Sequence, residues 1–160
     1  MISQKWSKLI RSLQQKKYRK AEQQFFVEGE KAVLELLASN WQVDAVFATE
    51  RFLQQYPQQV KTAALVQQCS ADELVKVGTF ASNDAALAVV KMPPQTDFVP
   101  HRHGFVLVLD QINDPGNLGT LLRTALAAGV TEVWLAEGAD PTQPKVLRAS
   151  AGAALALPLR

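Results

Sequence analysis

The most constraining feature of this 160-residue chain is a continuous apolar run, FVLVL, at residues 105–109. An unbroken run of this length is typical of a strand that is buried on both faces of a parallel sheet. The polar turn QINDPGN follows, and LGTLLRTALAAG then carries an apolar stripe at helical spacing. Gly129 supplies the stop for that helix. The stripe consists of Leu118, Leu121, Leu122 and Ala125.

The same alternation continues to the end of the sequence. TEVWLAEG predicts a second strand, and PTQPKVLRASAGAAL predicts a second helix with Pro144 near its first turn. LPLR is expected to begin a third strand. The order β-α-β-α-(β) predicts a parallel sheet with right-handed crossovers, so the fold class is α/β.

A second, smaller α/β region precedes this one. EGEKAVLELLAS predicts a helix, QVDAVFAT a strand, and AALAVVKM a further buried strand. Ser70 and Glu73 have the spacing of a capping box, which starts a short helix that reaches about Val77. PPQTDFVPHRHG, rich in proline, predicts a linker. We therefore expect domains at residues 1–97 and 105–160, joined by a linker at 98–104.

Positive charge is concentrated at the beginning of the chain. Residues 1–20 carry seven cations and no acid, whereas the other ten cations and fifteen acids leave a charge of −5. Trp6, Leu9, Ile10 and Leu13 recur at helical spacing, so this stretch predicts an amphipathic helix with a basic polar face. Such a face suits RNA or another polyanion, although a solvated surface helix and a membrane-surface helix are the alternatives. The cations are Lys5, Lys8, Arg11, Lys16, Lys17, Arg19 and Lys20.

Several other classes of protein find no support in the sequence. No apolar run reaches the roughly 18 residues of a membrane span, and the basic N-terminus does not resemble a signal peptide. The single Cys69 can form no internal disulfide, which favours a reduced, cytoplasmic setting and a buried thiol. His101 and His103 flank Arg102, but no nearby carboxylate or cysteine has ligand spacing, so no metal site is expected.

The predicted functional edge is the segment from Asp110 to Asn117, because ligands of parallel α/β sheets bind beyond the carboxyl ends of the strands. Backbone donors at the start of the next helix favour an anion there. Neither G-x-G-x-x-G nor G-x-x-x-x-G-K-[ST] occurs, so dinucleotide binding and P-loop chemistry lack support. With Asn117 near the cap, Arg123 is expected in the second helical turn, as an active-site residue or as a surface arginine.

The string LDQINDPGNLGTLLRTALAAGV closely resembles motif 1 of the SpoU/TrmH family of RNA ribose 2'-O-methyltransferases, and KVLRASAGAALALPL resembles the segment before motif 2. FFVEGEKAVLELLAS and AALAVV resemble that family's N-terminal substrate-binding domain, whose fold is similar to ribosomal kink-turn binders. The resemblance implies a small RNA-binding domain followed by the first half of a parallel-sheet methyltransferase domain with an α/β knot.

Carried over residue by residue, the resemblance makes Asn117 an active-site asparagine and Arg123 the catalytic arginine. It implies S-adenosylmethionine as methyl donor, rRNA or tRNA as partner, and a homodimer at full length. The glycine-rich motif 2 and the Ser-Leu-Asn motif 3, which hold the cofactor in the knot, do not occur before Arg160. We therefore expect an incomplete and inactive chain whose cofactor-binding residues lie beyond Arg160. The alternative is a non-catalytic RNA-binding or assembly module.

Overall fold

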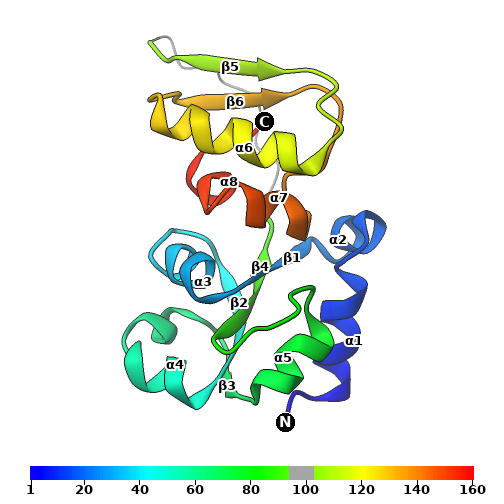
Figure 1. Cartoon of the computed structure of the whole chain (residues 1–160), viewed down its shortest axis with the longest axis vertical. Helices are drawn as coiled ribbons and strands as arrows, with labels where there is room; N and C mark the ends of the chain where they lie inside the picture. Colours follow the sequence, from blue (N-terminus) through cyan, green and yellow to red (C-terminus); the bar gives the residue numbers. More distant parts are fainter. Residues whose placement is uncertain (94–102) are drawn as a thin grey trace. The chain divides into compact units, whose positions relative to one another are not determined.

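The computed structural model describes residues 1–93 and 103–160, and the chain divides into two compact units, Met1–Pro93 and Pro94–Arg160 (Figure 1). Most of the predicted linker, including His101 and Arg102, lies outside the described residues. The boundaries at 97, 98 and 104 therefore stay predictions.

The first unit is a three-layer α/β structure around one four-stranded sheet. The sheet order is β1-β4-β2-β3, with β4 antiparallel to both β1 and β2, and β3 parallel to β2. In chain order the elements are α1 (Gln4–Ser12), α2 (Lys16–Glu22), β1 (Gln24–Glu28), α3 (Glu30–Leu37), β2 (Val43–Ala48), α4 (Glu50–Gln55), η1 (Gln59–Thr62), β3 (Val66–Gln68), α5 (Ala71–Val77) and β4 (Ala86–Lys91).

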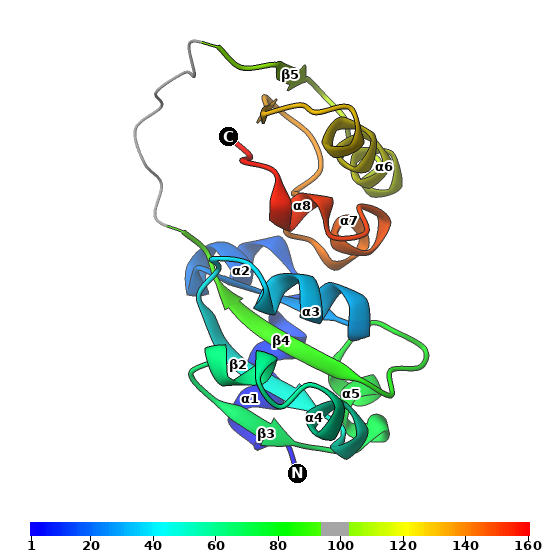
Figure 2. The same ribbon diagram turned by 90° about the vertical axis from the view of Figure 1, so that its left-hand side faces the viewer.

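The two faces of this sheet pack against different helices. Figure 2 shows α3 in front of the sheet and α1 behind it. Phe26, Phe47 and Leu87 point to the α1 and α5 side, where they form a buried cluster with Ile10 and Leu74. Successive residues of a strand alternate between faces, which places the other buried residues of β1, β2 and β4 toward α3. The predicted helix, strands and capping box of this region are confirmed.

The basic N-terminal segment forms two helices instead of one. The apolar stripe of α1 packs inward as predicted, with Ile10 and Leu13 fully buried. The helix ends at Ser12, and α2 begins only at Lys16. The short break allows α2 to turn toward β1, which it contacts.

Glu28 at the end of β1 is a buried acid that anchors the loop after α5. Its two carboxylate oxygens accept the backbone N–H of Thr79 at 3.1 and 3.0 Å, and they also accept the Thr79 hydroxyl and the Phe80 N–H. Gly29 follows with φ +93°, and a Cβ there would lie 3.0 Å from the Phe80 ring. Glu28 and Gly29 of the FFVEGE string therefore have structural roles in this unit.

The second unit has the predicted parallel β-α-β-α order, but the second predicted helix is divided into two short helices. Val133 also forms a parallel bridge with Leu159, so the expected third strand begins there. Its elements are β5 (Val106–Leu109), α6 (Pro115–Ala127), β6 (Glu132–Leu135), α7 (Pro144–Ala149) and α8 (Ala153–Ala156), with β5 parallel to β6.

One expectation for this unit is wrong. The apolar run at 105–109 was expected to be buried on both faces, but Phe105 and Val108 are more than half exposed. Within the described residues β5 pairs with β6 alone, so it is an edge strand. α6 packs against both α7 and α8, whereas Val108 is exposed.

Candidate functional site

The candidate catalytic loop follows β5 and is fixed by the loop after β6. The backbone of Ile112 pairs with Gly138 in a parallel bridge, and Ala139 donates its N–H to the Ile112 carbonyl at 2.8 Å. Gly138 has φ +132°, and a Cβ on it would clash with the Ile112 backbone. Only glycine accommodates both that φ and that close approach. The two loops at the carboxyl ends of the parallel strands are thus held together.

Asp114 caps the helix that carries the candidate residues. Its Oδ1 accepts the backbone N–H of Asn117 at 2.7 Å, and Pro115 occupies the first helical position. The helix therefore begins before Asn117, which is its third residue. Arg123 is the ninth residue and lies in the third turn, so its expected place in the second turn is wrong. The sequence signal for the true start was the Asp-Pro pair, which is typical of a cap followed by N1.

Asn117 and Arg123 are both exposed, and within the described residues neither side chain has a hydrogen bond or ion pair. Arg123 follows Asn117 by six positions in the helix, which corresponds to about 9 Å along the helix axis and about 120° around it. The two side chains therefore occupy different faces of α6. Arg123 shares its face with Gly116 and Thr120, whose hydroxyl donates to the Gly116 carbonyl at 3.0 Å.

Gly119, in the middle of the candidate motif, is a packing residue. A Cβ at this position would lie 2.5 Å from the Cβ of Ala149 and 2.8 Å from the backbone nitrogen of Ser150. Gly119 is buried, so α6 approaches the end of α7 through a position that has no side chain. This close approach fixes the helix that presents Arg123, a role that sequence reasoning did not assign.

The Ser-Ala-Gly-Ala turn after α7 also has a structural role. Ser150 is fully buried, and its hydroxyl oxygen accepts the Ala154 N–H at 3.3 Å. Ala151 and Gly152 both have positive φ, at 48° and 90°. The turn therefore separates α7 from α8, both of which pack against α6.

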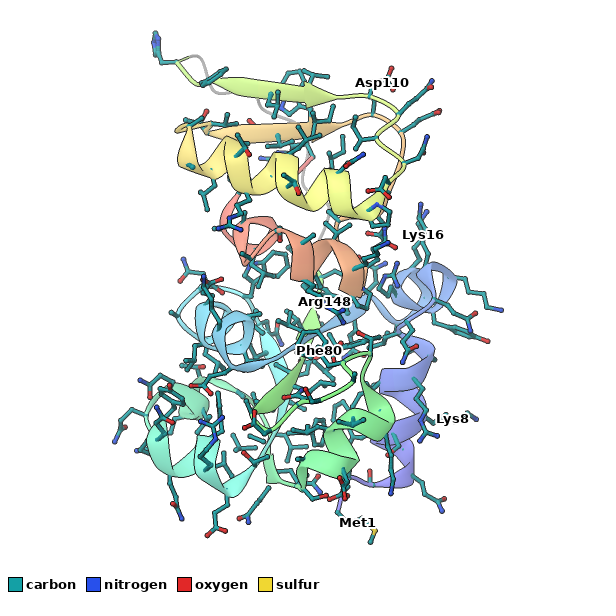
Figure 3. The ribbon with its side chains drawn as sticks, viewed as in Figure 1. Met1, Lys8, Lys16, Phe80, Asp110 and Arg148 are labelled. Atoms are coloured by element: carbon teal, nitrogen blue, oxygen red, sulfur yellow. The ribbon has the colours of Figure 1, made fainter. Side chains whose placement is uncertain are left out.

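The second candidate site is the basic surface of the first unit, formed by six exposed side chains of α1 and α2. Lys8 and Lys16 project from the edge that these helices form, away from the sheet (Figure 3). Arg11 donates through Nε to the Lys76 carbonyl at 3.2 Å, while the five lysines form no ion pair within the described residues. We call this set the basic surface: Lys5, Lys8, Arg11, Lys16, Lys17 and Lys20.

Arg19 does not belong to the basic surface, although its charge placed it in the predicted RNA-binding set. It is 2% exposed, and its Nη1 donates to the carbonyls of Leu13 and Gln14, both at 2.9 Å. The last carbonyls of a helix lack partners within that helix. Arg19 therefore caps the end of α1, and the sequence could not reveal this because the break between the helices was not predicted.

Two acids of the first unit are held by groups outside the basic surface. Hydrogen bonds from Tyr56 and Arg51 hold the pKa of Glu30 below its ordinary value. The backbone N–H groups of Ser70 and Ile2 likewise lower the pKa of Glu73. The positive charge of α1 and α2 is therefore not neutralised by these carboxylates.

Cys69 is buried as predicted, and burial raises the pKa of its thiol to about 12. In the described ranges no cluster of three or more His, Cys, Asp and Glu has the arrangement of a metal site. The helices described there are all too short or too polar to cross a membrane.

Comparison with known proteins assigns each unit to a different family. Residues 7–88 match the MRM3-like substrate binding domain, and residues 104–160 match the SpoU rRNA Methylase family.

Among curated proteins, the chain is 37% identical over 158 residues to an uncharacterized tRNA/rRNA methyltransferase of Synechocystis, covering 94% of this chain and 57% of that protein. It is 32% identical over 150 residues to the Bacillus subtilis 23S rRNA (guanosine(2553)-2'-O)-methyltransferase RlmP, covering 93% of this chain and 58% of that protein. The chain thus spans less than two thirds of these relatives.

Solved structures show the same partial coverage. An AdoMet-bound rRNA methyltransferase from Sinorhizobium meliloti superposes with a TM-score of 0.84 at 28% identity, over 99% of this chain and 62% of that one. A protein from Porphyromonas gingivalis, assigned to the TrmH family of RNA methyltransferases, superposes with a TM-score of 0.87 at 34% identity, over the same shares.

Proposed function

Since the chain belongs to the SpoU rRNA methylase family and carries an MRM3-like substrate-binding domain, we propose that the whole protein methylates a ribose 2'-hydroxyl of rRNA or tRNA. The observation that carries this proposal is the capped helix α6, which two interlocked loops position. Its Asn117 and Arg123 side chains are exposed and have no hydrogen-bond or ion-pair partner among residues 1–93 and 103–160. The first unit would bind RNA, and the second would contribute part of the active site.

The methyl donor of the complete enzyme would be S-adenosylmethionine, which supplies an electrophilic methyl group on a sulfonium. The residues that hold it are expected beyond Arg160, because the chain covers 62% of the AdoMet-bound structure. We therefore expect the 160-residue chain alone to bind S-adenosylmethionine weakly or not at all. Formation of a homodimer and a cytoplasmic location are further parts of the proposal.

Arg123 would act through charge and geometry. Transfer would join the ribose oxygen to the methyl carbon as the bond between that carbon and the donor's sulfur breaks, which leaves a neutral thioether. The 2'-hydroxyl proton would pass to water. A guanidinium with a pKa above about 12 is a poor proton acceptor near neutrality. Its planar fork suits holding a phosphate and stabilising negative charge on the attacking oxygen. The exposed position of Arg123 on α6 leaves this fork accessible.

The catalytic proposal is tested on the protein extended by the coding sequence that follows Arg160. We expect Arg123→Ala to nearly abolish single-turnover methylation of RNA while RNA affinity falls only modestly. Arg123→Lys keeps the charge but loses the fork, so it should stay severely defective from about pH 6 to 10. Near-normal turnover by the alanine variant would remove Arg123 from the mechanism.

The RNA-binding proposal is tested on the 160-residue chain. Each phosphate contact contributes about 0.7–0.9 to the slope of log affinity against log salt concentration. The double variant Lys8→Glu/Lys16→Glu should therefore lower the slope by about 1.4–1.8 in a filter-binding titration with structured RNA. Lys31→Glu/Lys61→Glu is the matched control, because it changes exposed lysines outside the basic surface by the same net charge. Equal effects of the two double variants would contradict the proposal.

A further inference from the structure

Tyr18 is an exposed aromatic side chain that the fold of the first unit does not use. Its relative exposure is 37%, and it is the sole aromatic among the exposed large hydrophobic residues described in 1–93. Trp6, Trp41 and Phe52 all take part in ring contacts. In the described part of the chain, Tyr18 has no contact with another aromatic ring, and its phenol group forms no hydrogen bond.

The surroundings of Tyr18 are cationic. The Lys17 ammonium lies 4.7 Å from the centroid of the Tyr18 ring. Lys16 and Lys20 are exposed on the same short helix, and Glu22 is its one acid. A cation over the ring is attracted by its π electrons, and the exposed part of the ring remains available to a flat ligand.

The helix α2, which carries Tyr18, is anchored to both α1 and β1. The adjacent Arg19 is buried and donates to the carbonyls of Leu13 and Gln14, which ties α2 to the end of α1. α2 also contacts β1. The backbone that carries Tyr18 is therefore anchored, so little backbone entropy is lost when a ligand stacks on the ring.

We propose that Tyr18 is a stacking platform for an unpaired RNA base, with Lys16, Lys17 and Lys20 holding the flanking phosphates. This inference rests on the proposed RNA-binding function and narrows the substrate to RNA with a bulged or looped-out nucleotide at the basic surface. In an A-form duplex the bases stack on one another and their faces are not accessible, whereas an unpaired base stacks readily on an aromatic ring.

The test uses two fluorescein-labelled RNA hairpins of equal length. One carries a single bulged 2-aminopurine, and the other is fully paired. We expect the 160-residue chain to bind the bulged hairpin more tightly and to change its 2-aminopurine fluorescence. Tyr18→Ala should weaken binding to the bulged hairpin by about 5- to 150-fold, since stacking on one base contributes about 1–3 kcal/mol. Binding to the paired hairpin should change by less than about twofold, because only the phosphate contacts remain there.

Two further variants distinguish loss of the aromatic ring from loss of side-chain volume. Tyr18→Phe keeps the ring and should bind the bulged hairpin like the unmodified chain, whereas Tyr18→Leu should behave like Tyr18→Ala. Melting curves by circular dichroism check that each variant is folded. The inference is overturned if the unmodified chain binds both hairpins equally, or if Tyr18→Ala leaves binding to the bulged hairpin unchanged. It is also overturned if Tyr18→Ala weakens binding to both hairpins by the same factor.

These failures differ from a failure of the proposed function. If Tyr18→Ala does not change RNA affinity but Lys8→Glu/Lys16→Glu still lowers the salt slope of RNA binding, the proposed RNA-binding function is supported. In that case the stacking role of Tyr18 is rejected. If the unmodified chain binds neither hairpin but binds vesicles of anionic phospholipid, both are rejected in favour of a membrane-surface role for α1 and α2.

Discussion

Replacement of Gly119 by alanine tests whether the candidate motif is shaped by packing between α6 and α7. In an exposed helix interior this change stabilises by about 0.5–1 kcal/mol, because alanine loses less conformational entropy than glycine. Here the new Cβ would meet Ala149 Cβ at 2.5 Å, Ser150 N at 2.8 Å and the Ala149 carbonyl carbon at 2.9 Å. Two of these atoms belong to the backbone, so no side-chain rotation relieves the clash.

Overpacking of this kind costs about 1–3 kcal/mol, which outweighs the gain in helix propensity. We therefore expect Gly119→Ala to destabilise the second unit by about 1–2 kcal/mol. For a unit of this size the transition temperature should fall by about 4–8 °C per kcal/mol. Urea unfolding gives the free energy, and hydrogen exchange of the amides of α6 and α7 locates the effect.

Two variants control this experiment. Gly116→Ala lies in the same helix, and its Cβ would meet no backbone atom but only the capping oxygen Asp114 Oδ1, at 3.1 Å. A shift of a few tenths of an ångström relieves this contact, so the stability should stay within about 0.5 kcal/mol of that of the unmodified chain. Adding Ala149→Gly to Gly119→Ala removes the 2.5 Å contact and should restore part of the stability. A Gly119→Ala chain as stable as the unmodified one would refute the close approach of the two helices.

Two other changes separate structural residues from functional ones. Arg19→Ala leaves two carbonyls at the end of α1 without their charged donor and should cost about 1.5–3 kcal/mol in urea unfolding, while the salt slope of RNA binding stays unchanged. A lowered slope with unchanged stability would instead place Arg19 on the RNA. Glu73 has a folded-state pKa below 4.5, so its carboxylate stabilises the fold above about pH 4.5, and this contribution disappears as the pH falls through the lower folded pKa. The urea midpoint of the unmodified chain should therefore exceed that of Glu73→Gln near pH 6, and the two should converge as the pH falls through the folded-state pKa of Glu73. A difference that stays constant across the pH range contradicts this assignment.

Local patterns in the sequence were sufficient to predict most helices and strands. The capping box at Ser70 and Glu73 marked the start of α5, and its helix ends at Val77 as predicted. Alternating β-α-β-α segments predicted the parallel pairing of β5 and β6. These features depend on neighbours in the chain, through hydrogen bonds and side-chain spacing, so they can be predicted without knowledge of tertiary contacts.

The motif LDQINDPGNLGTLLRTALAAGV likewise identified the family, and with it Asn117 and Arg123 as candidate residues. Their catalytic roles remain predictions. The sequence analysis did not identify Asp114 as the start of the helix, although the Asp-Pro pair is a local signal of a cap followed by the first helical residue.

Other features were decided by tertiary structure. Arg19 and Lys20 are adjacent cations, yet the first is buried under α1 and the second is exposed, because only the break after Ser12 directs Arg19 toward unpaired carbonyls. Val108 belongs to a run that predicted complete burial, yet it is exposed because β5 is an edge strand in the described part of the chain. Charge and hydrophobicity are properties of single residues, but burial depends on which segments pack together. The sequence thus determined the elements and the candidate chemistry, whereas only the packed structure decided which of those side chains remain available to a ligand.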